Sequence, residues 1–78
     1  ATDNAIITYV VNGNNRRVTI EIFDILGQRM QILVDMLQDA GIYSIPLSEH
    51  INLPGNGFYL IRMTVDGAYQ TQRFQILR

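Results

Sequence analysis

Short apolar runs separated by turn-forming residues constrain the fold of this chain more than any other feature. In the clearest run, residues 18–23, every second residue is an aliphatic one: Val18, Ile20 and Ile22. A period of two places these residues on one face of a β-strand. Similar runs, bounded by Gly, Asn, Asp or Pro, cover residues 6–11, 29–34, 41–47, 57–65 and 68–77. The pattern predicts an all-β domain.

The last third of the chain predicts a β-hairpin. Asp66-Gly67 separates its two runs, and Asp-Gly is a preferred two-residue turn. This turn sets a register in which Val65 pairs with Ala68 and Tyr59 pairs with Phe74. The expected core face of the hairpin holds Tyr59, Ile61, Met63, Val65, Phe74 and Ile76. The opposite face holds Phe58, Leu60, Arg62, Tyr69, Arg73 and Leu77.

The segments between the other runs are less regular. Asn12-Gly13 predicts a turn before a strand that starts at Arg17. Residues 34–38 have apolar side chains at helical spacing, but their flanks favour a loop. Pro46 indicates an edge or a strand end, and residues 48–52 could form a single turn.

Six or seven short strands with regular turn signals predict an antiparallel Ig-like β-sandwich. Its expected buried residues are Val18, Ile20, Ile22, Tyr43, Tyr59, Ile61, Phe74 and Ile76.

The composition excludes several kinds of site. The chain has 78 residues, a formal net charge of −1 and no cysteine. Disulfides, thiolate metal sites and thiol nucleophiles are therefore excluded. All six basic residues are arginines, which excludes lysine chemistry, and the slightly acidic balance gives no bulk attraction to nucleic acid. No run reaches the roughly 20 apolar residues of a membrane-spanning helix.

No motif predicts catalysis. His50 is the only histidine, and no nucleophile pattern accompanies it. The carboxylates are scattered over strands and turns, and Asp35 with Asp39 lacks the dense oxygen-ligand loop of a calcium site. We therefore expect no catalytic residue, no metal, no cofactor and no small-molecule substrate.

The outer face of the hairpin is the one unusual surface. It interleaves apolar and aromatic side chains with two arginines. A second sheet or a loop could cover the apolar part. Alternatively, the face binds a partner, because aromatic and arginine side chains are enriched at interaction hot spots. The residues that define this candidate patch are Phe58, Leu60, Arg62, Tyr69 and Arg73.

Four motifs in order resemble those of the type A C-terminal sorting domain of the type IX secretion system of Bacteroidota-like bacteria. They read VTIEIFDILGQRM from Val18, AGIYSIPL from Ala40, NLPGNGFYLIRM from Asn52 and RFQILR from Arg73. The resemblance covers residues 6–78. Two features depart from the family pattern: the chain starts ATDNA where relatives often have Asn-Pro, and Gly55-Asn56 adds a residue before Gly57.

The resemblance implies an Ig-like β-sandwich at the carboxyl end of a secreted cargo protein. Residues 1–5 would end a linker from a preceding cargo domain, and residues 6–78 would form the sorting domain. The implied partners are a shuttle protein and the outer-membrane translocon, followed by a sortase-like surface protease that removes the domain. The domain would be periplasmic in transit, then at the cell surface or secreted. By the same resemblance, the residues that contact the machinery are Gly41, Tyr43, Gly57, Tyr59, Phe74, Ile76, Leu77 and Arg78.

Two other functions remain open from the sequence. An Ig-like accessory domain could serve as a carbohydrate-binding module, or the chain could be a domain of the hook-capping type. A carbohydrate binder should show a flat platform of exposed aromatic side chains, often with tryptophan, and this chain has no tryptophan. A small hydrolase lacks the residues it would need.

Overall fold

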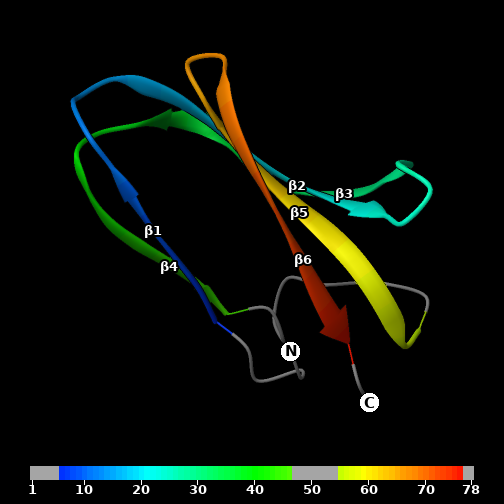
Figure 1. Cartoon of the computed structure of the whole chain (residues 1–78). Helices are drawn as coiled ribbons and strands as arrows, with labels where there is room; N and C mark the ends of the chain where they lie inside the picture. Colours follow the sequence, from blue (N-terminus) through cyan, green and yellow to red (C-terminus); the bar gives the residue numbers. More distant parts are fainter. Residues whose placement is uncertain (1–5, 47–54, 77–78) are drawn as a thin grey trace.

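The computed structural model describes residues 6–46 and 55–76, and these residues form six β-strands (Figure 1). In chain order the strands are β1 Ile6–Val11, β2 Arg16–Asp24, β3 Arg29–Gln38, β4 Gly41–Pro46, β5 Gly57–Val65 and β6 Ala68–Ile76. All paired strands are antiparallel, so the all-β prediction is confirmed. Within the described residues, no helix is long and apolar enough to cross a membrane.

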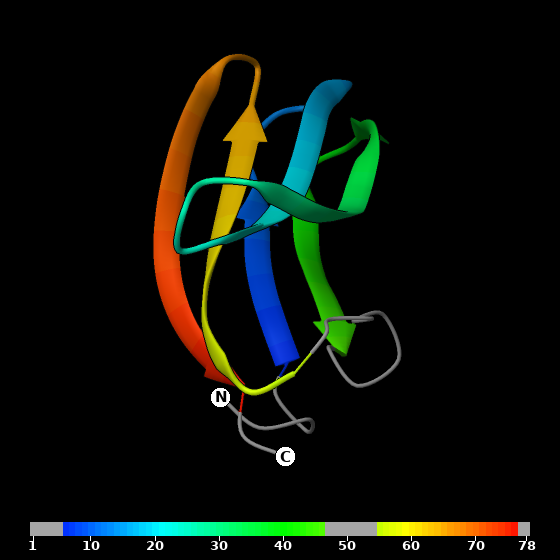
Figure 2. The same ribbon diagram turned by 90° about the vertical axis from the view of Figure 1, so that its right-hand side faces the viewer.

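The strands form two packed sheets, and the predicted sandwich-like architecture is confirmed. The smaller sheet pairs β1 with β4, and the larger has the order β3-β2-β5-β6. Figures 1 and 2 show the two-stranded sheet as a separate layer beside the larger one, with β6 at an edge. Only one face of the four-stranded sheet is therefore turned toward the smaller sheet. We call this the inner face, and the opposite side the outer face.

The core lies between the sheets and extends along β2. The three aliphatic residues of the alternating run, Val18, Ile20 and Ile22, are at most 1% exposed. The first two pack with Tyr9, Val11 and Ile45 of the smaller sheet, which closes one end of the core. Burial of these side chains removes apolar surface from water and supplies the main favourable term for folding.

A second cluster closes the other end of the core and joins Ile22 to Tyr59 and Ile76. Five of the eight predicted core residues are buried, but Tyr43, Ile61 and Phe74 are only half-buried. Two strands cover only part of a four-stranded sheet, and β4 and β6 are edge strands. These three side chains therefore keep one side in contact with solvent.

The hairpin is confirmed with its register. Val65 pairs with Ala68, and Tyr59 pairs with Phe74. Asp66 and Gly67 have φ angles of 49° and 90°, so both turn residues are left-handed, as a type I′ turn requires. Each face of β5 and β6 therefore holds the residues that the turn predicted for it.

One predicted element is wrong: residues 34–38 continue β3 and are not a loop. The cause is a β-bulge. Val34 pairs with Ile20 and Ile32 pairs with Glu21, which leaves Leu33 as an extra residue. The bulge interrupts the period of two, so Leu33 and Val34 both pack against the core. The predicted turn at residues 48–52 lies outside the described residues, as do His50, Leu77 and Arg78.

The predicted Asn12-Gly13 turn connects the two sheets, because β1 pairs with β4 and not with β2. This loop contacts the β3–β4 connection. The backbone N–H of Asn15 donates to Asp39 Oδ1 at 2.9 Å, and the N–H of Ala40 donates to Asn14 Oδ1 at 3.1 Å. The β1–β2 and β3–β4 connections, which both pass between the sheets, therefore stabilise each other.

Candidate functional site

The outer face of the four-stranded sheet contains the candidate patch predicted from the hairpin. The smaller sheet packs on the other side and does not cover it. Phe58 is 47% exposed and Tyr69 is 65% exposed, which leaves aromatic surface in contact with solvent. Leu60 and Arg62 are half-buried, and Arg73 is exposed. The five patch residues thus lie on one accessible surface.

Aromatic rings hold both arginines of the patch. The Cζ atom of Arg62 lies 4.7 Å from the ring centroid of Phe23 and 5.1 Å from that of Tyr69. The Cζ atom of Arg73 lies 5.1 Å from the ring centroid of Phe58. These distances are within the range of cation–π interactions. The patch is therefore an ordered array of rings and guanidinium groups.

Strand register explains this array. Arg62 of β5 lies opposite Glu21 of β2 and Thr71 of β6. Of the two rings that contact it, that of Phe23 lies two positions after Glu21 and that of Tyr69 lies two positions before Thr71. Such diagonal neighbours are within reach of aromatic and long side chains. Arg73 and Phe58 have the same diagonal relation across β5 and β6. Two parallel rows result. One runs from Phe23 through Arg62 to Tyr69 across three strands, and the other runs from Phe58 to Arg73 across two.

The guanidinium of Arg62 is partly removed from water without full compensation. Its Nε atom is buried and has no hydrogen-bond partner. A ring face attracts the cation but cannot replace a directional hydrogen-bond acceptor. The cation is therefore fixed in place while some of its donor capacity stays unused.

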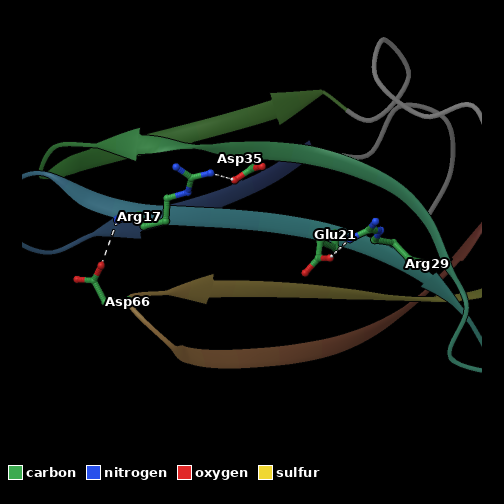
Figure 3. Close-up of polar contacts among 5 residues, drawn as sticks. All are labelled: Arg17, Glu21, Arg29, Asp35 and Asp66. Atoms are coloured by element: carbon green, nitrogen blue, oxygen red, sulfur yellow. Dashed lines mark hydrogen bonds and ion pairs between the residues drawn. The ribbon is translucent and has the colours of Figure 1, made fainter.

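The other described arginines are neutralised. Arg17 binds Asp35, and Arg29 Nη1 lies 3.3 Å from Glu21 Oε2 (Figure 3). Arg16 binds Asp66 at 2.9 Å. Among the described residues, no carboxylate forms an ion pair with the two patch arginines. Glu21 lies opposite Arg62 in register, but its bond goes to Arg29.

The described carboxylates serve the fold. Asp24 Oδ1 accepts hydrogen bonds from the backbone N–H groups of Leu26 and Gln28, each at 2.9 Å, and so closes the β2–β3 turn. A hydrogen bond from the Arg16 side chain lowers the pKa of Asp66 below its ordinary value. A second hydrogen bond, from the backbone N–H of Arg17, acts in the same direction (Figure 3). Within the described ranges, no group of three or more His, Cys, Asp or Glu side chains could hold a metal ion.

The residues implied by the family resemblance lie in two places. Gly57 pairs with Ile76 and Tyr59 pairs with Phe74, so these four gather at one end of the β5–β6 hairpin. The Tyr59 and Phe74 ring centroids are 5.9 Å apart. Gly41 and Tyr43 are on β4 in the smaller sheet.

In that smaller sheet, the ring of Tyr43 stacks on Tyr9 with a centroid distance of 5.3 Å. Each of the two motif tyrosines donates its hydroxyl to a carbonyl four residues earlier, Tyr43 to Asp39 at 2.6 Å and Tyr59 to Gly55 at 3.0 Å. These bonds fix the tyrosine side chains, so the structure gives both residues a role in the fold.

A cleft of about 300 Å³ between β1 and the hairpin was not predicted. Its apolar floor includes Ile20, Ile61 and Met63, and Gln70 and Gln72 of β6 line it too. The positions of two glutamines in the hairpin could have predicted this cleft. Gln70 and Gln72 lie opposite Met63 and Ile61, so they place uncharged amides on the inner face.

Among the described residues that line the cleft, Tyr9 alone has a titratable side chain. Burial raises the pKa of its phenol, and the neighbouring Tyr43 adds to the rise, whereas the hydrogen bond to Gln38 Oε1 at 2.9 Å opposes it. Tyr9 is therefore neutral near pH 7. The cleft suits a neutral ligand and provides no acid or base.

Phe23 is the residue of the patch that sequence reasoning missed. The alternation in β2 places it on the face opposite the core residues, but nothing local to β2 shows that this face continues into the hairpin. Recognising it required the pairing of β2 with β5, which puts Phe23 next to Leu60. That pairing joins segments about forty residues apart, and local signals do not specify it.

Comparison of the chain with protein-family models, with curated proteins and with solved structures gives no match. Inference about function therefore depends on the residues and on the geometry described above. That geometry provides an accessible face with two fixed cations and exposed aromatic rings, an uncharged cleft, and an edge strand. These are features of binding surfaces.

Proposed function

We propose that this chain is a C-terminal sorting domain of the type IX secretion system. It would direct an attached cargo protein from the periplasm across the outer membrane. One observation supports this most: residues from two separate sorting motifs, Gly57-x-Tyr59 and Phe74-x-Ile76, are direct register partners at one end of the hairpin. Tyr59 and Ile76 are buried there and hold the two motifs together, while Gly57 and Phe74 keep part of their surface accessible to a partner.

The position of the last motif also supports this function. It lies on β6, which is an edge strand with one side unpaired in the described sheet. An unpaired edge offers backbone N–H and C=O groups that a strand of another protein can bind. The shuttle protein and the translocon are the proposed partners, and a sortase-like protease at the cell surface is the proposed processing enzyme. The domain itself acts by being bound, not by catalysis.

The proposed Ig-like fold and location follow from the same resemblance. The domain is periplasmic in transit and then at the cell surface or secreted with its cargo. The two-layer antiparallel architecture fits this proposal, since a compact sandwich with its own core can follow a cargo domain as an independent unit.

Export of a reporter tests the proposal. The chain is fused behind a reporter with a periplasmic export signal in a bacterium that has the type IX machinery. We expect the reporter outside the cell, and we expect the reporter without the domain in the periplasm. An intact fusion that stays in the periplasm of a competent host would refute the proposal.

A matched pair of variants separates recognition from folding. Leu77→Ser with Arg78→Ser alters the end of the last motif, and Ile25→Ser alters a turn residue that is 68% exposed. We expect only the first change to reduce export, with thermal unfolding near that of the parent domain for both. Equal export by the two variants would show that the carboxyl end is not a recognition element.

Carbohydrate binding is the second candidate, and the exposed rings of Phe58 and Tyr69 favour it. Sugars stack on such rings through their apolar faces. Retardation of the purified domain in gels that contain neutral polysaccharides tests this function. If retardation occurs and Phe58→Ala abolishes it, the accessory-module function replaces the sorting function.

A further inference from the structure

The outer face has an unneutralised positive charge in a chain that is slightly acidic overall. The chain has a formal net charge of −1, yet Arg62 and Arg73 have no carboxylate partner among the described residues. The paired arginines on the same face, Arg17 and Arg29, are already satisfied. Any anion that approaches this face therefore meets two available cations.

Stacking prepares these cations for binding. Rings on both sides of the Arg62 guanidinium restrict its motion, and the ring of Phe58 does the same for Arg73. A cation that is already fixed loses less conformational entropy when it binds. Because Arg62 Nε is buried, part of this guanidinium lies in surroundings of lower dielectric than water, where attraction to an opposite charge is stronger.

The spacing of the two arginines selects a shape for the anion. Arg73 is diagonal to Arg62 across β5 and β6, because Arg62 pairs with Thr71. Diagonal neighbours are about 7–8 Å apart. Along an extended chain, side chains two residues apart point the same way and are separated by about 7 Å. Two carboxylates at positions i and i+2 of an extended segment therefore have the same spacing as the backbone positions of Arg62 and Arg73.

We infer that the outer face binds an extended acidic segment of a partner protein, with carboxylates at positions i and i+2 on Arg62 and Arg73. Apolar residues of the segment cover the exposed rings of Phe58 and Tyr69. The inference deepens the proposed function and rests on it, because it names the kind of segment that the secretion machinery would present. Binding by the purified chain tests this surface separately from export.

Titration of the full 78-residue chain with short synthetic peptides tests the inference. The probe is a peptide with a Glu-x-Glu sequence, and the controls are its Gln-x-Gln counterpart and a peptide with the two glutamates adjacent. Adjacent side chains of an extended chain point to opposite sides, so the second control retains the charge but loses the match. We expect the Glu-x-Glu peptide to bind most tightly, and its affinity to fall as salt is raised.

Three variants of the chain complete the test. Arg62→Gln and Arg73→Gln should each weaken binding about tenfold or more, because each removes a charge-assisted contact. Arg17→Gln removes the same charge from the same face, but from an arginine that Asp35 already neutralises, and should change the affinity by less than about twofold. Because Arg73 is exposed, we expect Arg73→Gln to fold. This variant therefore tests the inference even if Arg62→Gln does not fold.

The inference is wrong if the Gln-x-Gln peptide binds equally well, or if Arg17→Gln weakens binding as much as the patch variants. It is also wrong if a sulfated polysaccharide or single-stranded DNA binds as tightly as the acidic peptide, because the face would then recognise charge density alone. If the intact fusion is not exported while the purified chain still binds the Glu-x-Glu peptide, only the sorting function is refuted.

Discussion

The inner and outer faces of β2 and β5 are stabilised by different interactions. On the inner face, Ile20 and Ile22 are at most 1% exposed and make apolar contacts. On the outer face of the same strand, Glu21 binds Arg29, and Phe23 lies against Arg62. Burial of apolar surface is not directional, whereas ion pairs and cation–ring contacts are. With a period of two, β2 therefore separates a packed apolar core from an accessible array of charges and rings.

The largest effect should come from the inner face. Ile22→Ala is expected to lower the free energy of unfolding by about 2–5 kcal/mol, because it leaves a cavity in the cluster that Ile22 forms with Tyr59 and Ile76. The matched control is Ile42→Ala, at a side chain that is 75% exposed, with an expected change within about 0.5 kcal/mol. Urea unfolding measures both. Similar losses for the two variants would contradict the assignment of the core.

The hairpin turn keeps the two faces apart, and its disruption should have the next largest effect. Gly67 has a φ of 90°, and an added Cβ would meet no atom within 4 Å, so the cost of Gly67→Ala is backbone strain alone. We expect a loss of about 1–2 kcal/mol. Gly41→Ala is the control, since its Cβ would make an ordinary contact with Tyr43 at 3.7 Å. An unchanged stability of the Gly67 variant would argue against the left-handed turn.

The outer face should contribute less to stability than the inner face. Arg62→Met keeps an unbranched side chain between the two rings and removes both the charge and the unpartnered Nε. The lost cation–π attraction and the removed desolvation penalty oppose each other, so we expect a change within about 1 kcal/mol. Thermal and urea unfolding measure it. A loss as large as that of Ile22→Ala would make Arg62 a structural residue.

The smallest effect concerns pH and the Asp66 carboxylate. Its hydrogen bonds hold the pKa in the folded state below the ordinary value of 3.8. The ionised form therefore stabilises the fold above that value, and the contribution is lost as pH falls through the lower, folded-state pKa. Asp66→Asn removes the charge but keeps a residue that tolerates a positive φ before Gly67.

We expect the parent chain to be more stable than this variant at neutral pH, with the difference shrinking below pH 3.8. Melting temperatures across the pH range provide the measurement. A difference that does not vary with pH would show that the carboxylate adds nothing beyond the shape of the turn.

Local signals in the sequence predicted the parts of the fold that depend on neighbouring residues. The alternation of β2 and the Asp66-Gly67 turn gave the core face and the hairpin register. The extent of β3 was not predictable in this way, because the bulge at Leu33 interrupts its period. The partial exposure of Phe74 depends on how far the smaller sheet extends, which no single segment specifies.

In the candidate site, too, local signals predict some features, and others depend on pairing between distant strands. The hairpin register was enough to place Phe58 and Arg73 on one face. Which arginines are neutralised was not predictable, because the Arg29–Glu21 pair depends on the bulged register between β2 and β3. The stacking of Arg62 on Phe23 likewise depends on a long-range pairing.

The NMR signals of the arginine Nε–H groups test the division between the two faces and the role of the outer one most directly. In the unbound chain, the Arg62 signal should be shifted upfield by the two rings and should exchange slowly with water, because this Nε is buried without an acceptor. When the Glu-x-Glu peptide is added, the signals of Arg62 and Arg73 should move, and those of Arg17 and Arg29 should stay. Equal movement of all four, or movement of the paired arginines alone, would contradict the account.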